Sequence, residues 1–433
     1  MLKYVLAFLV LSIIIMIHEF GHFIVAKASG VVVKEFSLGM GPRILKFTRN
    51  GTMYSIKLFL FGGSCQMLGE DEDSDKEGSF NSKSVWKRIA IIAAGPIFNF
   101  LLAFVFSIVL IGTVGYDPCI VYSVDEGTSV YEAGLEPGDV ITQINGSNVT
   151  FYGDYSMYLL LNEGDEIKEN TEIELTIERD GKEMVITFIP EYVDEDVYQM
   201  GIYYNPENAL ISEVMEDSAA ESAGMKSGDR IVSINGTEVV NSNDISDLIQ
   251  ASNGEEMEIV VERDDNEVTL KVTAKTAHTT YYDYGFDLSG ERVKVGPLET
   301  IGYSFKQVGY WIKQVFNSFR LLFTGVASVN DMSGPVGIVS AIGDVVEESK
   351  ADGAFYVFLN LLNWTIMISA NLGVMNLLPI PALDGGRLVF LFIEAVRRKP
   401  ISREKEGMVH FVGIVLLMIL MVVILFNDIR KLF

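Results

Sequence analysis

The sequence of 433 residues contains only two cysteines and four histidines. The cysteines, Cys65 and Cys119, fall in regions that we predict to lie on opposite sides of a membrane, which argues against a structural disulfide. Basic residues are also scarce, because 33 lysines and arginines stand against 58 acidic residues. They form no basic stripe and do not alternate with aromatic residues, so the sequence gives no indication of a nucleic-acid-binding protein.

Apolar sequence, in contrast, is abundant. Hydrophobic residues make up 49% of the chain and the mean hydropathy is +0.29, which is typical of a membrane protein with sizeable soluble parts. The net charge of −25 is unevenly distributed, since residues 117–299 hold 40 acidic and 10 basic residues. That segment carries −30 and the rest of the chain +5. We therefore expect the two portions to face different compartments.

Four apolar stretches are long enough to cross a bilayer, which takes about 20 residues. They are Leu2–Ala26, Ile89–Val114, Phe355–Leu378 and Met408–Phe426. The second stretch also holds Gly95, Pro96 and Asn99, and the third is rich in asparagine. The fourth is apolar apart from His410 and is interpreted as a scaffold helix.

The orientation of these spans follows from their basic flanks. Lysine and arginine concentrate in residues 27–88 and 387–405, and loops with this bias lie in the cytoplasm. Four spans then place both termini and the acidic segment 117–300 outside the cell. Arg430 and Lys431 at the C-terminus argue weakly for the opposite orientation.

The first apolar stretch contains the sequence His-Glu-Phe-Gly-His at residues 18–22. In a helix, His18 and His22 lie on one face and can share a zinc ion. Glu19 then projects beside the metal and can act as a general base and acid. Ionisable residues inside an apolar span are costly and usually functional, which favours a site over a chance match. His18 follows Leu2 by 16 residues, or roughly 24 Å of helix in a core of about 30 Å, so the site is predicted near the cytoplasmic face.

The N-terminus also has a simpler interpretation. Lys3, the apolar run and Ala26-Lys27-Ala28 are similar to a secretory signal with its cleavage site. Cleavage there would remove the histidine motif. Histidines and a glutamate are foreign to the apolar core of a signal peptide, so a retained helix is favoured.

A catalytic zinc usually has three protein ligands, so one more is required. His278 lies in the outer segment, and His410 has no second ligand type at helical spacing, which makes a carboxylate the better candidate. Asp384 lies just past the third span, at the predicted depth of the histidines. Pro379 and Pro381 precede it and break the helix, which lets a loop bend toward the metal.

The basic segment between the first two spans contains apolar stretches with glycines, which predict short strands and glycine turns. They are Val31–Val33, Phe36–Gly41 and Tyr54–Gly63. We predict that they dip into the membrane beside the first span, where a free strand edge at Gly62 and Gly63 can bind an unwound substrate. The alternative is a small cytosolic hairpin.

An internal repeat lies between the second and third spans. Residues 133–146 and 223–236 share the pattern A-G-(L/M)-x-x-G-D-x-I-x-x-I-N-G at an offset of 90 residues, the size of a small domain. The pattern resembles PDZ domains, whose groove receives an extended peptide end. The strands predicted after each copy are Glu172–Glu178 with Glu183–Ile189, and Glu256–Glu262 with Val268–Thr273. The pair either binds peptide C-termini or acts only as a spacer or size filter. An amphipathic helix is predicted at Ile301–Ala327, followed by a tight turn at Ser333–Gly337.

Together, the HEFGH sequence, the sequence NLLPIPALDG at residues 376–385 and the tandem PDZ-like repeats resemble the site-2 protease family of intramembrane zinc metalloproteases, in its bacterial PDZ-containing branch. The resemblance covers nearly the whole chain. It implies one catalytic Zn²⁺ held by His18, His22 and Asp384, with Glu19 as acid and base and Asn376 contacting substrate or oxyanion. It also implies cleavage within single-span type II membrane proteins that another protease has already trimmed, such as anti-sigma factors, or within remnant signal peptides.

The predicted fold is a multi-pass α-helical bacterial cell-membrane protein with four transmembrane helices, membrane-associated β-hairpins and two extracytoplasmic α+β PDZ-like domains. The predicted parts are a first transmembrane helix (1–28), a cytoplasmic β region (29–88), a second helix (89–115), PDZ-like domains (116–191 and 197–276), a clamp region (300–350), a third helix with the NLLPIPALDG sequence (354–386), a cytoplasmic loop (387–407) and a fourth helix (408–427).

Two other functions are compatible with parts of the sequence. A membrane-anchored PDZ scaffold with a structural metal site is disfavoured by the presence of Glu19. A zinc transporter or metal sensor is expected to carry more histidine, cysteine or aspartate along its spans than this chain does.

Overall fold

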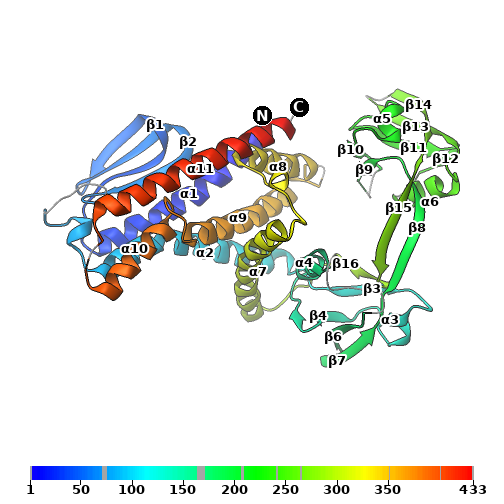
Figure 1. The fold of residues 1–433 in the computed structure, drawn as a ribbon, viewed down its shortest axis with the longest axis horizontal. Coiled ribbons are helices and arrows are strands. Elements are labelled where there is room, and N and C mark those ends of the chain that lie inside the picture. The colour runs from blue at the N-terminus through cyan, green and yellow to red at the C-terminus, as the bar shows by residue number, and fades with distance from the viewer. Residues whose placement is uncertain are drawn as a thin grey trace. The chain divides into compact units, whose positions relative to one another are not determined.

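The computed structural model describes residues 2–70, 76–162, 171–205, 209–239, 242–263, 266–350, 352–399 and 401–431 (Figure 1). The chain forms two compact units. Unit 1 comprises Met1–Ile120, Val140–Glu166 and Ser289–Phe433, and unit 2 comprises Val121–Asp139 and Ile167–Leu288. The sequence of residues 70–77 is acidic and polar, which predicts a connector, and part of it lies outside the described residues.

Within the described residues, unit 1 is built around four helices that are long and apolar enough to cross a membrane. They are α1 (Leu2–Ala28), α2 (Val85–Val114), α9 (Ala354–Leu377) and α11 (Arg403–Lys431). Each matches a predicted span, although α2 begins four residues earlier than expected. Helix α2 packs against both α1 and α9, whereas α11 is largely exposed. An exposed apolar helix of this length is what lipid would cover.

The close packing of α1 on α2 depends on Gly21, in the middle of the histidine motif. A Cβ atom at this position would lie 2.4 Å from the carbonyl oxygen of Ala94 in α2, so no larger residue fits. The two helix backbones therefore approach one another at the level of the histidines.

The segment between α1 and α2 forms one long hairpin of β1 (Val33–Arg49) and β2 (Thr52–Met67), and not several short strands as predicted. Residues 35–38 of β1 pair on one side with residues 53–56 of β2 and on the other side with residues 63–66. The two strands therefore fold back into the equivalent of a four-stranded sheet. Gly39, with φ of 86°, makes the bend in β1. Because β1 and β2 are the only strands that the described residues contribute to this sheet, residues 63–67 form one of its edges.

The later part of unit 1 differs from prediction in two places. Residues Ser333–Gly337 do not form an isolated turn, because α8 (Pro335–Glu348) begins there. The carboxylate of Asp428 in α11 accepts hydrogen bonds from the backbone N–H groups of Gly334 and Gly337, at 2.9 Å each, and so caps this helix from a distant part of the chain. The predicted loop 387–407 is mostly helical, since α10 (Asp384–Arg397) begins at Asp384 itself.

The amphipathic helix predicted at Ile301–Ala327 is present as α7 (Pro297–Thr324). Its first turn has Pro297 at the start and a hydrogen bond from the Gly296 N–H to the Glu299 carboxylate at 2.9 Å. The remaining elements of unit 1 are η1 (Phe80–Ser82), β4 (Val140–Ile144), β5 (Ser147–Asn148), α4 (Tyr152–Asn162) and η2 (Val329–Asp331).

Unit 2 contains most of the internal repeat. The hairpins predicted after each copy are present as β6 (Ile173–Arg179) with β7 (Lys182–Phe188), and as β13 (Glu256–Arg263) with β14 (Asn266–Thr273). In the second copy the strand order is β12-β11-β13-β14. The other elements are β3 (Ile120–Val124), α3 (Ser129–Glu132), β8 (Glu191–Gln199), β9 (Ile202–Tyr204), β10 (Ile211–Val214), α5 (Ala219–Ser222), β11 (Arg230–Ile234), β12 (Thr237–Glu238), α6 (Ser242–Ala251), β15 (Lys275–Asp283) and β16 (Phe286–Ser289).

Each copy of the repeat contains an equivalent ion pair with a buried aspartate. The motif aspartates, Asp139 and Asp229, are each 1% exposed. Asp139 pairs with Arg179 at the end of β6, and Asp229 pairs with Arg263 at the end of β13, with the closest N···O distance 2.6 Å in both. The aspartate of the repeated pattern is therefore a structural residue that ties a turn to a strand.

Candidate functional site

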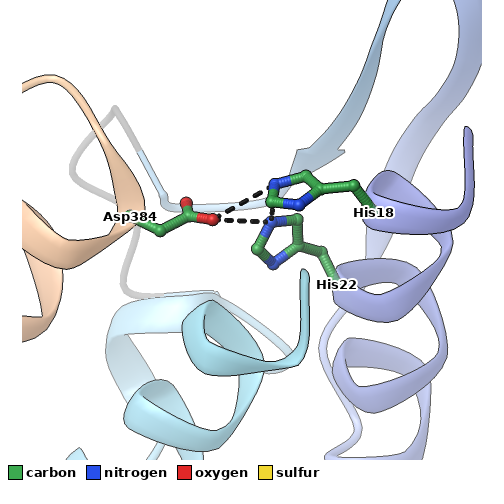
Figure 2. A group of neighbouring side chains, drawn as sticks. All are labelled: His18, His22 and Asp384. Carbon is green, nitrogen blue, oxygen red and sulfur yellow. Dashed lines mark hydrogen bonds and ion pairs between the residues drawn. The ribbon is translucent and has the colours of Figure 1, made fainter. Parts of the chain in front are cut away.

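Three side chains from two helices meet in unit 1. His18 and His22 come from successive turns of α1, and Asp384 is the first residue of α10 (Figure 2). The Nε2 atoms of the histidines are 3.3 Å apart, and Oδ2 of Asp384 lies 3.2 Å from His18 and 3.3 Å from His22. All three atoms point into one small space.

These distances fit a metal ion. In a tetrahedral zinc site with bonds of about 2.0–2.1 Å, two ligand atoms lie about 3.3–3.4 Å apart. The three observed separations lie within about 0.2 Å of that spacing. Oδ2 of Asp384 is buried and has no conventional hydrogen-bond donor among the described residues, as expected of an oxygen that serves as a ligand. Two imidazoles and one carboxylate also leave a fourth position for water or substrate.

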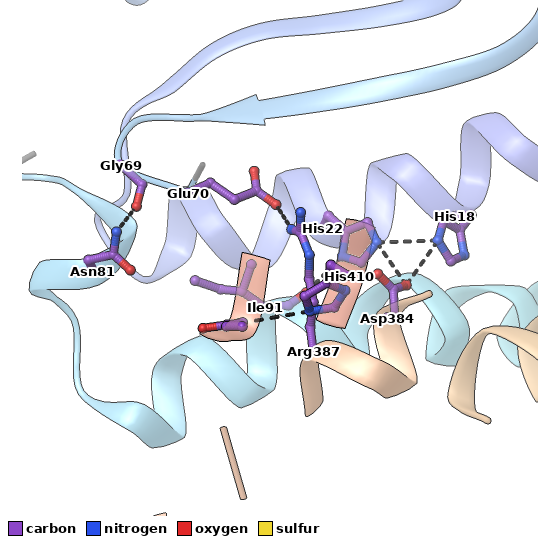
Figure 3. A network of polar contacts seen from close by, with 10 residues as sticks. His18, His22, Gly69, Glu70, Asn81, Ile91, Asp384, Arg387 and His410 are labelled. Atoms are coloured by element: carbon purple, nitrogen blue, oxygen red, sulfur yellow. Dashed lines mark hydrogen bonds and ion pairs between the residues drawn. The ribbon is translucent and has the colours of Figure 1, made fainter. Parts of the chain in front are cut away.

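The outer nitrogen of each imidazole is held by α2. Nδ1 of His22 donates a hydrogen bond to the carbonyl oxygen of Ile91 at 2.9 Å, which leaves the lone pair on Nε2 (Figure 3). Nδ1 of His18 lies 3.2 Å from the side-chain amide of Asn99, a fully buried residue. Oδ1 of this amide has no other partner among the described residues, and turning the amide by 180° lets Oδ1 accept from Nδ1–H. Both imidazoles are then set to coordinate through Nε2.

Gly95 of α2 supplies the room for both rings. A Cβ atom there would lie 2.3 Å from Nε2 of His22 and 2.8 Å from Cε1 of His18. From the sequence, Gly95 and Asn99 are noted only as residues within the second span and are assigned no role. In the sequence they are visible only as a glycine and an asparagine in an otherwise apolar stretch. Nothing connects them to the histidines until α1 packs on α2.

Asp384 is presented by a tight connection between α9 and α10, residues 378–383. Gly385 and Gly386 let the start of α10 press against this connection, since their Cβ atoms would lie 2.0 Å from the Leu378 carbonyl oxygen and 2.5 Å from that of Ile380. Within it, Ala382 has φ of 81°, a conformation that costs a non-glycine residue about 1–3 kcal/mol. Surrounding contacts must hold this backbone in place.

Glu19 and the edge of the β-sheet border the same space. A cavity of about 480 Å³ is lined by the three converging residues and Glu19, together with Lys34, Ser64, Cys65, Gln66, Met67, Gly69, Glu70 and Ile92. At the edge, Gly63 touches the glutamate closely, because a Cβ atom at Gly63 would lie 2.9 Å from Cγ of Glu19. The strand edge predicted to bind substrate therefore runs directly beside Glu19.

A buried carboxylate fixes this sheet. Glu35 of β1 is 1% exposed and accepts hydrogen bonds from Arg43, at 2.6 and 2.9 Å, and from the Ser55 hydroxyl at 2.6 Å. The hydrogen bonds from Arg43, helped by Ser55 and the nearby Lys57, lower the pKa of Glu35 from 4.5 to about 2. Glu35 therefore remains charged, and its contacts join neighbouring strands of the sheet.

Asn376, predicted to contact substrate or oxyanion, lies near the end of α9 and is half-buried. Asn376 is not one of the described residues that line the cavity, so its contact with substrate or oxyanion stays a prediction. Beside the cavity, Arg387 of α10 forms an ion pair with Glu70 (Figure 3).

This site is that of a membrane metalloprotease. Two histidines and an aspartate fit a metal, a glutamate lies beside them, and the helices are long enough to span a membrane. The chain belongs to peptidase family M50, the site-2 protease family, whose family model matches residues 6–420.

Named relatives match along the whole length. The chain is 30% identical over 453 residues to zinc metalloprotease RasP of Geobacillus kaustophilus, covering 100% of this chain and 99% of the relative. It is 30% identical over 456 residues to the regulator of sigma-W protease RasP of Bacillus subtilis, covering 99% of each. It is 31% identical over 451 residues to the regulator of sigma E protease of Salmonella typhi, covering 98% of this chain and 97% of the relative. The chain is thus a zinc metalloprotease of the membrane.

Solved structures match only in part. The HtrA3 PDZ domain is 17% identical and covers 20% of this chain and 92% of its own length, with a TM-score of 0.18. That score is too low to assign a fold, and the PDZ character of the repeats remains a prediction.

Proposed function

We propose that this protein is an intramembrane endopeptidase that hydrolyses peptide bonds within single-span membrane proteins. The observation that carries the proposal is the convergence of three ligand-type atoms at 3.2–3.3 Å in a cavity that Glu19 and a free strand edge also line. His18, His22 and Asp384 would hold one zinc ion. When bound, zinc supplies Lewis acidity that activates water and stabilises developing negative charge.

Glu19 performs the proton transfers. Its carboxylate takes the proton from the attacking water and delivers it to the leaving amine, which requires a base within hydrogen-bonding reach of the water. Its place beside His18 in the sequence and in the same cavity supports this role. Lys34, Ser64, Gln66 and Glu70 make the cavity polar, so it can hold the water that hydrolysis consumes.

The edge of β2 binds the substrate in extended form. A transmembrane substrate helix satisfies its own backbone hydrogen bonds, so its peptide bonds are inaccessible until it unwinds. The free edge at residues 63–67 offers backbone groups to pair with the unwound segment, next to Glu19. Gly62 and Gly63 are the predicted contact residues, and the close approach of Gly63 to Glu19 supports this assignment.

The substrates are proposed to be type II membrane proteins that have already lost most of their outer domain, such as anti-sigma factors, or remnant signal peptides. Two relatives carry names that refer to sigma-factor regulation, which supports this class. The acidic repeat region is proposed to face the outside and restrict entry by size, because the basic segments of the chain flank the opposite ends of the helices.

The direct test compares wild type with Glu19→Gln and Asp384→Ala, each purified and given a single-span model substrate. Glu19→Gln removes the proton-transfer group and no ligand, so it is expected to bind zinc normally and to lose cleavage. Asp384→Ala is expected to lose both zinc and cleavage. Substantial cleavage by Glu19→Gln, or unchanged zinc affinity of Asp384→Ala, would overturn these roles. A wild-type protein that binds zinc but cleaves no membrane substrate would instead favour a scaffold with a structural metal.

A further inference from the structure

Helix α11 has little buried surface, yet it contacts the connection that presents Asp384. Only 11% of the residues in its most apolar stretch are buried, which would suit a helix that merely anchors the protein. Two of its residues contact residues 378–383, however, and a purely lipid-facing helix needs neither of them. They are a histidine, His410, and a glycine one turn later, Gly413.

His410 holds the strained residue of the connection. The backbone N–H of Ala382 donates a hydrogen bond to Nδ1 of His410 at 2.9 Å. The imidazole must therefore be neutral, with its proton on Nε2. Ala382 is two residues before Asp384 and has the positive φ, so this bond fixes the backbone where it is least able to hold its own conformation. Figure 3 includes His410 in the polar network around Asp384.

Gly413 allows α11 to come close enough for that bond. A Cβ atom at Gly413 would lie 2.4 Å from Cβ of Pro381 and 2.6 Å from its carbonyl oxygen. Any larger residue would have to displace the backbone of the connection or the whole helix. At Gly407 of the same helix, no described atom lies within 4 Å of the position that a Cβ atom would take. The close contact with a neighbouring backbone is therefore particular to Gly413 and not shared by Gly407.

We propose that His410 and Gly413 are positioning residues that hold the Pro381–Ala382 backbone and thereby set the place of Asp384 in the zinc site. Residues 378–383 are clamped between Gly385 and Gly386 of α10 on one side and these two residues of α11 on the other. The fourth membrane helix is thus part of the catalytic architecture and more than the scaffold that its apolar sequence suggests. The inference rests on the proposed role of Asp384 as a zinc ligand.

The test measures zinc affinity of the full-length protein by competition with a chelator, together with kcat and KM on a single-span substrate. His410→Leu removes the acceptor and keeps an apolar side chain of similar size. His410→Asn restores an acceptor, since its Oδ1 occupies the place of Nδ1. Gly413→Ala pushes on Pro381, and Gly407→Ala is the matched control.

We expect His410→Leu and Gly413→Ala to bind zinc about 10–100-fold more weakly and to lower kcat, with KM changed by less than about threefold, because outer partners of metal ligands have effects of this size. His410→Asn and Gly407→Ala are expected to stay within about threefold of wild type in zinc affinity. If His410→Asn loses as much affinity as His410→Leu, the hydrogen bond is not the cause and the proposal is wrong.

The proposal is also overturned if both His410→Leu and Gly413→Ala bind zinc as wild type does. If His410→Leu fails to fold, the comparison of Gly413→Ala with Gly407→Ala decides. Comparison of wild type with Asp384→Ala separates this inference from the proposed function. Unchanged zinc affinity in Asp384→Ala refutes the ligand assignment. If Asp384→Ala loses zinc while the α11 variants keep it, only the positioning role is refuted.

Discussion

Gly95→Ala tests the geometry of the site most sharply, because it adds one methyl group and removes no functional atom. The Cβ atom of the new alanine would lie 2.3 Å from Nε2 of His22, against an ordinary contact of at least 3.4 Å. His22 or α2 must therefore give way by about 1 Å. The same atom would also lie 2.8 Å from Cε1 of His18, so neither ring can simply move toward the other.

A displacement of this size is large for a metal site. The three ligand atoms are separated by 3.2–3.3 Å, and a movement of about 1 Å at one of them takes it out of bonding range of a shared ion. Misplacement by about 1 Å can cost about 100-fold in activity, so we expect zinc affinity and kcat to fall by at least that factor. Alanine is a better helix former than glycine by about 1 kcal/mol, so loss of α2 is not the expected cause.

The assay compares Gly95→Ala with Gly112→Ala in the same helix. At Gly112 the nearest atom to an added Cβ is Cγ2 of Thr300 at 3.7 Å, an ordinary contact. Zinc affinity is measured by chelator competition, and turnover on a single-span substrate. Wild-type zinc affinity and turnover in Gly95→Ala would refute the arrangement of the histidines against α2, provided that Gly112→Ala also behaves as wild type.

Three further predictions concern the sheet and the orientation of the chain. Gly63→Ala is expected to lower kcat at least tenfold and to leave zinc affinity unchanged. The added methyl group would lie about 2.9 Å from Cγ of Glu19 and would touch no zinc ligand. Weakened zinc binding in this variant would contradict the placement of Gly63 beside Glu19 alone. The lowered pKa of Glu35 means that its carboxylate stabilises the fold fully above pH 4.5, by about 3 kcal/mol, and that this contribution is lost as the pH falls toward about 2. Thermal unfolding of Glu35→Gln should therefore show a lower midpoint at pH 7 and a weaker acid dependence than wild type, and equal acid dependence would argue against the ion pair. Ser147 and Ser82 are both exposed. In intact cells, Ser147→Cys is expected to react with an impermeant thiol reagent, whereas Ser82→Cys is expected to stay protected. The reverse labelling pattern would invert the proposed topology.

The local features of this protein were readable from its sequence. His18 and His22 are four residues apart in apolar sequence without proline, and the helical period alone puts them on one face. The four membrane-length helices follow from hydropathy, and the repeat hairpins follow from alternating strands, so both predictions agree with the structure in place and type. Each of these depends on residues close together in the chain.

The tertiary structure decided everything that joins distant segments. Elimination pointed to Asp384, but only the packing of α10 against α2, and of α2 against α1, brings its oxygen to 3.2 Å from His18. Asn99 and Gly95 become site residues because α2 packs on α1 at Gly21, and residues 63–67 of β2 become an edge because the hairpin folds back, so that residues 35–38 pair with 53–56 on one side and 63–66 on the other. The start of α8 depends on Asp428, which lies more than 90 residues later. Such contacts leave no periodic pattern in the sequence, since each is set by the shape of two surfaces that meet only after the helices have packed.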